Sequence, residues 1–556
     1  MPSRHYFKTY FALTFFGVVL AIGGYFCWWV WLFQPPVPAG NDPITHLEMI
    51  QNFLGNPLLA IKRSQYPVGF HALIAVLSKV FHVKPITMLT SGAPFWLMLP
   101  VVSTVLVAKK LFDYRVGYLT LVLSVVLIPF PYLYVGAFPT ILVNQTALPL
   151  LICWVYYTYV LKEFSKIKLI WHTIAIAIFA SYLSLSHYNA LAYFYLAMFW
   201  LTMLAWARPK LRPRVKYLLI IITAVFGVNL LAYAVNPSLT IAKLVRTLAG
   251  QSISASSDQY FLGQADYFAY SHLSLLTQES LAKPNNNVAN FLSVPITYLF
   301  YACLICAVLL LTRKKIPSPY LPPYLLIGFL SVVYFGVAIL PFTPYGGRIL
   351  LDAMPWFLLF VASTIIFTIP VVLEAFLKPR LPGFMALAAR WSTILVGAIL
   401  LSGFMSVTPD LFTTSKLENA VADSFDQDGQ ALKSLRQYIN SQYPNGATIL
   451  SLPLRSYFPY LLPSKYTVIG PSRYSAIAPD ALNQDFGPNT DWGNYASNPG
   501  KFLTLLPKTT KIDMIIIRYH VPGEALNFDN VCAQTDYPHF NVFPTWGGFY
   551  LVCEKQ

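Results

Sequence analysis

Residues 189–235 read NALAYFYLAMFWLTMLAWARPKLRPRVKYLLIIITAVFGVNLLAYAV, two apolar runs separated by a short basic segment. Each run, 189–206 and 216–235, is long enough to cross a bilayer, because about 20 helical residues span the hydrocarbon core. The basic segment carries Arg208, Lys210, Arg212, Arg214 and Lys216. Short basic loops stay on the cytoplasmic side of a membrane. This stretch therefore predicts two transmembrane helices that are joined on the inside.

Apolar runs of this length recur along the whole chain. Of its 556 residues, 56% are hydrophobic and only 11% are charged, whereas soluble globular proteins carry about 25% charged residues. One soluble core cannot bury that much apolar surface, so the bilayer must solvate most of it. The pattern predicts an α-helical integral membrane protein with about eleven transmembrane helices. The predicted spans are residues 10–33, 86–108, 114–131, 139–160, 168–186, 189–206, 216–235, 290–311, 321–341, 348–374 and 386–408.

Basic residues mark every second connection between the predicted spans. The connections that follow the even-numbered spans are basic, as at residues 109–110 and 313–315. The short connections at 132–138, 187–188 and 342–347 contain no Lys or Arg. Because basic loops stay inside, we expect the N-terminus in the cytoplasm and the C-terminus outside. The formal net charge of +16 then reflects topology and anionic lipid headgroups, and nucleic acid is not expected as a partner.

The composition divides the chain into a membrane domain, residues 1–408, and a globular domain, residues 409–556. In the expected orientation the globular domain is extracytoplasmic, and two long loops, 34–85 and 236–289, lie on the same outer side. The tail is polar and charge-balanced, with one helical pattern among several strand patterns, which predicts a small α/β or α+β domain. A helix is expected at 430–438, and strands are expected at 447–452, 466–469, 513–518 and 548–553.

The six cysteines fall into two groups. Cys532 and Cys553 lie in the tail domain, and they could form a disulfide if that domain faces an oxidising compartment. The other four lie in apolar runs and are interpreted as inert core residues. They are Cys27, Cys153, Cys303 and Cys306.

The candidate for chemistry is the start of the first outer loop. This loop reads as amphipathic helices that lie on the membrane, with one at 71–81. At its beginning, Asp42 precedes Pro43, and a helix from this point places His46 one turn later on the same face. A carboxylate and an imidazole that share a face can accept a proton from a hydroxyl. Asp42 could instead only cap the helix, and Glu48 is expected to be solvated.

A divalent metal on Asp42 and His46 is a possible cofactor. Two ligands are too few to define such a site, so no metal is assigned.

Isolated cations near the outer surface are candidates for holding a phosphate. Arg348 follows Tyr345 in the sequence Pro344-Tyr345-Gly346-Gly347-Arg348 and is a cation near a short outer loop, against the topology rule. The alternative is an ion pair with Asp352 four residues on. Lys62 and Arg63 could also meet phosphate, or they could anchor an interfacial helix to headgroups.

Polar residues elsewhere on the outer side could line the same site. His187 lies in the tight turn between spans five and six, where it could contact substrate or simply cap the turn. Asp258, Asp266 and His272 lie in the second outer loop and could bind an acceptor or a metal, although loop carboxylates are usually solvated.

Two motifs in the first loop carry a resemblance. The chain contains Asp42-Pro43-Ile44-Thr45-His46 and, further on, Tyr66-Pro67-Val68-Gly69-Phe70-His71. Together with the many spans and the outer C-terminal domain, they resemble the GT-C superfamily of glycosyltransferases. The nearest in pattern are bacterial membrane proteins with a D-P-x-x-H loop. The teichoic-acid glycosylating enzymes of Gram-positive bacteria are more distant. The motif match covers residues 40–71, and the architecture covers the whole chain.

The resemblance implies a bacterial plasma-membrane enzyme of cell-wall or surface-polysaccharide biogenesis. Such an enzyme transfers a sugar from a polyprenyl-phosphate donor to a surface glycan or glycolipid acceptor, by inversion with Asp42 as the base. It also implies that Tyr66 and His71 contact substrate. Many superfamily members carry paired acidic residues at the base position. Asp42 has no such neighbour, which leaves metal dependence open.

Two alternatives to the glycosyltransferase stay open. A polysaccharide polymerase or ligase would share the substrate and the location, with an Arg-rich outer loop. A transporter or flippase of lipid-linked saccharide would place ionisable residues near the midplane, whereas here they cluster at helix ends. The chain contains no Walker loop, no G-x-G-x-x-G after a strand and no H-E-x-x-H, as expected of an enzyme that uses no nucleotide.

Overall fold

The computed structural model divides the chain into two compact units, which are described separately. The first comprises residues 1–26, 66–70 and 94–411, and the second comprises 27–65, 71–93 and 412–556. The structure describes residues 9, 12–14, 16–21, 23–24, 42–64, 66–127, 138–240, 287–339, 346–376, 388, 391–399, 428–452, 462–463, 465–469, 511–519, 532, 537–545 and 548–554. The expected domain boundary at 408–409 lies outside these residues.

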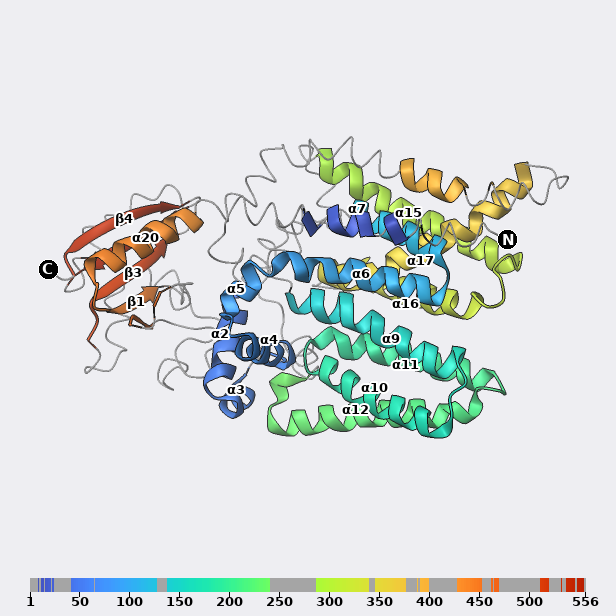
Figure 1. The fold of residues 1–556 in the computed structure, drawn as a ribbon, viewed down its shortest axis with the longest axis horizontal. Coiled ribbons are helices and arrows are strands. Elements are labelled where there is room, and N and C mark those ends of the chain that lie inside the picture. Colours follow the sequence, from blue (N-terminus) through green and yellow to red (C-terminus); the bar gives the residue numbers. More distant parts are fainter. Residues whose placement is uncertain are drawn as a thin grey trace. The chain divides into compact units, whose positions relative to one another are not determined.

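The first unit is built of long helices that run roughly parallel to one another (Figure 1). Each predicted span from residue 86 to residue 374 contains helix among its described residues. Short helical stretches in 12–24 and 391–399 lie within the first and last predicted spans. The helices are α6 (Ala93–Leu111), α7 (Tyr114–Leu127), η1 (Thr140–Ala147), α9 (Leu148–Tyr156), η2 (Tyr157–Leu161), α10 (Lys166–Ser184), α11 (Tyr188–Ala207), η3 (Arg212–Arg214), α12 (Val215–Val235), η4 (Pro237–Leu239), α15 (Asn287–Thr312), α16 (Leu321–Ile339) and α17 (Gly346–Phe376).

The lengths and compositions of these helices are those of a multi-pass membrane protein. Among the described residues, five helical stretches are long and apolar enough to cross a bilayer, and they begin at Thr140, Lys166, Tyr188, Arg212 and Met354. Their outer surfaces are apolar. Trp171, Ile178 and Leu231, for example, are each more than 60% exposed, as expected of side chains that face lipid.

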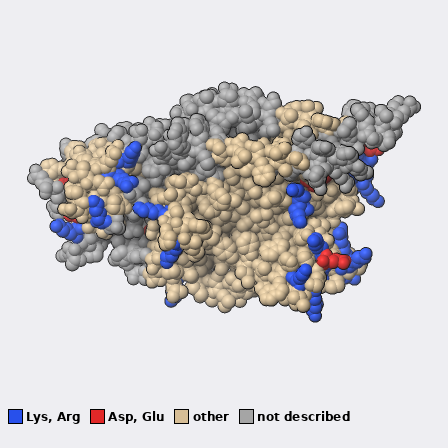
Figure 2. Space-filling model, in the orientation of Figure 1, with Lys and Arg blue, Asp and Glu red and all other residues tan. Residues whose placement is uncertain are grey.

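Basic connections between these helices meet at one end of the unit. The ammonium group of Lys110 lies 4.0 Å from the centre of the Tyr157 ring, and Arg214 donates to the carbonyl oxygen of Lys162 at 2.8 Å. Lys315 pairs with Glu374 at 2.7 Å. Figure 2 shows Lys and Arg side chains at this end of the bundle and a broad uncharged surface over the helices.

The other ends of the same helices gather polar groups of a different kind. The hydroxyl of Tyr188 donates to the carbonyl oxygen of Ser238 at 2.8 Å, and the amide of Asn189 reaches Asp352 on α17. The unit therefore has one end rich in Lys and Arg and one end that holds the turn between α10 and α11.

The first outer loop forms four helices: α2 (Asp42–Gly55), α3 (Pro57–Arg63), α4 (Gly69–Phe81) and α5 (Pro85–Thr90). The prediction of a single span at 86–108 was wrong at its start, because the chain turns at Ser91–Gly92 and separates α5 from α6. Helix α4 is amphipathic, as expected. Ile74 is fully buried, whereas Val80 and Phe81 are each more than 60% exposed.

In the described part of the tail domain, helix α20 (Asp428–Gln442) lies on one face of a five-stranded sheet (Figure 1). The strand order is β2-β1-β3-β5-β4, with β1 parallel to β2 and β3, and β5 antiparallel to β3 and β4. The sheet is thus mixed. The strands are β1 (Thr448–Leu452), β2 (Thr467–Ile469), β3 (Met514–Tyr519), β4 (His539–Thr545) and β5 (Gly548–Glu554).

The expected helix and four of these strands are confirmed, and β4 was not predicted. Its sequence contains Pro544, which cannot donate to a ladder. An edge strand tolerates this loss, and β4 is at the edge of the sheet, paired with β5.

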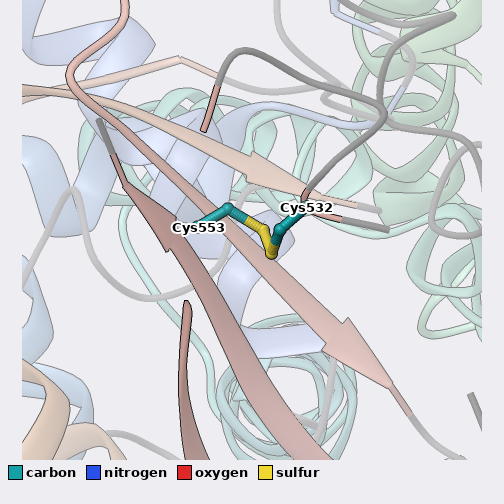
Figure 3. The surroundings of a disulfide bond; sticks show 2 residues. All are labelled: Cys532 and Cys553. Carbon is teal, nitrogen blue, oxygen red and sulfur yellow. A yellow bond between two sulfur atoms is a disulfide. The ribbon is translucent and has the colours of Figure 1, made fainter. Parts of the chain in front are cut away.

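Cys532 and Cys553 form a disulfide that ties the chain before β4 to strand β5 (Figure 3). Their Cα atoms lie 5.5 Å apart. The expected pairing is confirmed. Cys153 and Cys303 are free and buried among the membrane helices, and Cys306 is free and half-buried, whereas Cys27 lies outside the described residues.

Candidate functional site

The first motif forms the start of α2, which begins at Asp42 as its sequence predicts. Pro43 suits the first turn of a helix, where a missing N–H costs nothing. One turn later His46 is buried, and the neighbouring Leu47 and Ile50 are fully buried. The helix that the D-P-x-x-H motif predicts is therefore present, with Asp42 and His46 at positions that share a face.

His46 contacts a residue of the second motif. Its Nδ1 atom lies 2.9 Å from the Nε2 atom of His71 on α4, and the ring centroids are 5.1 Å apart. Both rings are buried, with exposed fractions of 6% and 0%. A hydrogen bond between two imidazoles needs one nitrogen as donor and the other as acceptor. The two facing nitrogens therefore carry one proton between them. A further proton could bind only at an outer ring nitrogen if this hydrogen bond is kept.

Glu48 is not solvated, contrary to the sequence-based expectation. It is 4% exposed and lies on α2 near Asn52, which is 6% exposed. The expectation was wrong because a helical pattern alone does not show what packs against a given face of the helix. Lys62, on α3, is exposed, and Arg63 is the last residue of that helix.

The Tyr66–Phe70 segment docks on the turn between α10 and α11. The backbone N–H of Gly69 donates to the carbonyl oxygen of Leu185 at 2.8 Å, and the hydroxyl of Tyr182 donates to the carbonyl oxygen of Gly69 at 3.1 Å. A Cβ at Gly69 would lie 2.0 Å from the Oγ atom of Ser186. The second motif therefore has glycine at this position because the turn leaves no room for a side chain.

The docked segment brings Tyr66 to the predicted residue His187. The two rings meet edge to face with centroids 6.4 Å apart, and Tyr66 meets Tyr188 in the same way at 5.3 Å. Two residues predicted from separate parts of the sequence are thus neighbours within the first unit.

His187 is the N-cap of α11, as the capping interpretation predicted. Its Nδ1 atom accepts from the backbone N–H of Asn189 at 3.2 Å, and it lies 2.9 Å from the side-chain nitrogen of Asn144. Its Nε2 atom lies 3.4 Å from the hydroxyl oxygen of Thr140. The ring is buried. It therefore joins the start of α11 to η1.

Asp352 connects α17 to the same place. Its Oδ2 atom accepts from the side chain of Asn189 at 2.5 Å and lies 3.4 Å from the hydroxyl of Tyr193. The carboxyl is fully buried. Arg348 lies one helical turn earlier on α17. A buried carboxyl group among membrane helices is expensive and usually functional.

Sequence reasoning did not identify Asn144 or Asn189 as site residues, and it treated Asp352 only as a partner for Arg348. The signal in the sequence for Asn144 was a polar amide within the predicted apolar span 139–160. Tyr345 and Asp266, with Asp258 and His272, lie outside the described residues. Within the described part of the chain, no group of three or more His, Cys, Asp or Glu side chains could hold a metal ion.

The chain is structurally similar to GT-C membrane glycosyltransferases over most of its length. It aligns with ArnT from Cupriavidus metallidurans in the apo state with a TM-score of 0.54 and 11% identity, covering 98% of both chains. It aligns with the apo oligosaccharyltransferase of Archaeoglobus fulgidus with a TM-score of 0.51 and 12% identity, covering 92% of this chain and 70% of that one.

These alignments show a GT-C-like fold, as the resemblance in architecture implied. No family model matches the sequence, and no curated protein matches it.

Proposed function

We propose that the chain is a membrane glycosyltransferase that moves a sugar from a polyprenyl-phosphate donor to a surface glycan or glycolipid. The observation that carries the proposal is the end-to-end fold similarity to ArnT, with 98% of both chains covered. The similarity to an oligosaccharyltransferase supports the same reaction class. Because a fold alone does not define an activity, the residues at the two motifs must supply the rest of the argument.

The proposed topology has eleven spans, with the N-terminus inside and the tail domain outside. The basic contacts of Lys110, Arg214 and Lys315 lie at one end of the first unit, which is then the cytoplasmic end. The disulfide Cys532–Cys553 supports an extracytoplasmic tail, since such bonds persist in oxidising compartments. The exposed apolar face of α4, with Val80 and Phe81, supports an interfacial position of the first loop.

In the proposed reaction Asp42 is the general base. It takes the proton of the acceptor hydroxyl as that oxygen forms a bond to the anomeric carbon of the donor sugar. The bond from that carbon to the phosphate oxygen breaks, and polyprenyl phosphate leaves with the electron pair. Attack from the face opposite the leaving group inverts the anomeric centre. The buried His46–His71 pair lies one turn along α2, where position 46 shares a helix face with position 42.

The departing phosphate needs positive or N–H groups nearby. We assign Arg348 to this role, with Tyr345 before it, because α17 begins with this segment and carries the buried Asp352 one turn later. Lys62 and Arg63 on α3 are further candidates for the phosphate or for lipid headgroups. Asp266, in the second outer loop, is kept as an acceptor-binding candidate.

Mass spectrometry of surface glycans tests the proposed function. A deletion strain should lack one sugar that wild-type cells carry, and a plasmid with the intact gene should restore it. A plasmid that encodes Asp42→Asn should give membrane protein at normal levels without restoring the sugar. Unchanged surface glycans in the deletion strain would count against a glycosyltransferase.

A further inference from the structure

The tautomer of His187 follows from its hydrogen bonds. The backbone N–H of Asn189 can only donate, and it points at the Nδ1 atom of His187 at 3.2 Å. That nitrogen must therefore carry the lone pair, and the ring proton must be on Nε2. The ring is neutral in this arrangement, and its one N–H faces the hydroxyl oxygen of Thr140 at 3.4 Å, a distance at which a hydrogen bond is weak.

The same lone pair fixes the orientation of Asn144. Its side-chain NH₂ group donates to Nδ1 of His187 at 2.9 Å, so its carbonyl oxygen must point the other way. Asn144 is fully buried, and within the described structure its Oδ1 atom has no hydrogen-bond partner. A buried unpaired acceptor costs about 1–3 kcal/mol. If the amide were turned round, the Oδ1 atom of Asn144 would face the Nδ1 atom of His187. Both atoms are acceptors, so this orientation would be unfavourable as well.

Asn144 lies in η1, a segment with the wide turns of a π-helix. The backbone N–H of Leu148 bonds to the carbonyl oxygen of Val143, five residues back, and the hydroxyl of Thr146 bonds to the carbonyl oxygen of Ile141. π-Helical turns are rare in proteins, and those that occur are often found at functional sites. A costly amide orientation and an irregular helix thus coincide at one histidine.

We propose that Asn144 is a positioning residue that, with the backbone of Asn189, holds His187 as the neutral Nε2–H tautomer for donation to a phosphate oxygen of the lipid-linked donor. This inference rests on the proposed function for its ligand. A phosphate oxygen is a stronger acceptor than the Thr140 hydroxyl, because a charged acceptor makes a shorter and stronger bond.

The position of α17 supports this choice of ligand. The side chain of Asn189 bonds to Asp352, and Arg348, the proposed phosphate cation, lies one turn before Asp352. The hydrogen-bonded chain from Asn144 through His187 and Asn189 therefore ends on the helix that carries this cation. Nothing in this chain of bonds needs His187 to act as a base.

The first test reads the ring of His187 directly. Full-length protein labelled with ¹⁵N-histidine, with the resonances assigned by comparison with His187→Gln, should show Nδ1 unprotonated and Nε2 protonated. Asn144→Asp is nearly isosteric but presents an acceptor to Nδ1, so it should place a proton there. A protonated Nδ1 in the wild-type protein would overturn the proposal.

The second test separates positioning from general packing. Asn229→Asp is the matched control, because Asn229 is also buried, also has an unpartnered Oδ1 and donates to Ser184 at 2.8 Å on another helix. Asn144→Asp should lower kcat about 100-fold with little change in KM, as expected for lost stabilisation of developing charge. Asn229→Asp should lower kcat less than about threefold. Equal losses in the two variants, with an unchanged His187 ring, would overturn the positioning role.

The third test concerns the ligand. Farnesyl phosphate should shift the Nε2 resonance of His187, and farnesol, with the same chain and no phosphate, should not. Equal shifts from both compounds would exclude the phosphate as the partner. The ring and ligand tests do not depend on turnover. A wild-type protein that passed both but transferred no sugar would refute the proposed function and leave the tautomer and the phosphate contact standing.

Discussion

The Nδ1 atom of His46 lies 2.9 Å from the Nε2 atom of His71, and both rings are buried. The two residues are the histidines of two separate sequence motifs. They come from α2 and α4, so their hydrogen bond ties the helix that begins at Asp42 to the helix that begins at Gly69. Because the two rings are directly hydrogen-bonded to each other, loss of either ring should have the same effect on activity.

Substitutions at the two histidines should therefore be non-additive. His46→Gln and His71→Gln should each lower kcat/KM by about 10- to 100-fold, because each removes the same shared hydrogen bond. The kcat/KM of the double variant should be no lower than that of the less active single variant. Kinetics of sugar transfer in reconstituted membranes measure this, and multiplied losses in the double variant would show that the rings act independently.

Gly69→Ala should undock the Tyr66–Phe70 segment. Its Cβ would lie 2.0 Å from the Oγ atom and 3.0 Å from the Cβ atom of Ser186, and overpacking of this kind costs about 1–3 kcal/mol. Ser186→Gly in the same chain should restore part of the loss. Gly227→Ala on α12 is the control, since a Cβ there meets nothing within 4 Å. The readout is thermal stability in detergent, and a wild-type value for Gly69→Ala would contradict the docking.

Gly446→Ala should destabilise the tail domain. Gly446 has a φ of +105°, and a Cβ there would lie 2.3 Å from the carbonyl oxygen of Lys465. A side chain in this left-handed region costs about 1–3 kcal/mol before the clash is added. Hydrogen exchange at β1 and β2 of the full chain measures the loss. Gly55→Ala, which meets nothing within 4 Å, should leave exchange there unchanged. Equal protection in both variants would refute the strain.

The tail domain should lose stability as the pH rises past the ordinary carboxyl range. Burial raises the pKa of Glu554 above its usual 4.5, although a hydrogen bond from Tyr438 and the nearby His539 oppose the rise. The folded state then binds the proton more tightly than the unfolded state. This stabilisation is complete below pH 4.5 and is lost as the pH rises through the raised pKa.

Glu554→Gln should remove that pH dependence. The free energy of opening, from hydrogen exchange at β4 and β5 corrected for intrinsic rates, should fall with pH in the wild type and stay flatter in the variant. The same slope in both proteins would show that another group is responsible.

Most of the helical architecture could be predicted from the sequence. A membrane span leaves a long apolar run, and the alternation of basic and non-basic connections records its direction. The contacts of Lys110 with Tyr157 and of Arg214 with Lys162 join three of the basic connections to one another. The disulfide could be predicted because only two cysteines lie outside the apolar runs.

The contacts within the site could not be predicted, because they join positions far apart in the sequence. Asn189 and Asp352 are 163 residues apart, and Asn144 and His187 are 43 apart. No periodicity connects such pairs. The burial of Glu48 depends on what packs against α2, and strand β4 was obscured by Pro544. The break between α5 and α6 at Ser91–Gly92 falls inside a run that is apolar enough to appear continuous.

The most direct measurement is the rate of sugar transfer by Asp42→Asn in proteoliposomes that contain polyprenyl-phosphate sugar and acceptor. Asp113→Asn is the matched control, since Asp113 caps α7 and pairs with Arg115 at 2.8 Å, near the basic end of the first unit. We expect Asp42→Asn to fold and insert normally and to lose transfer by at least about 100-fold, while Asp113→Asn keeps most of its activity. Full activity in Asp42→Asn would contradict the assignment of this carboxylate as the base.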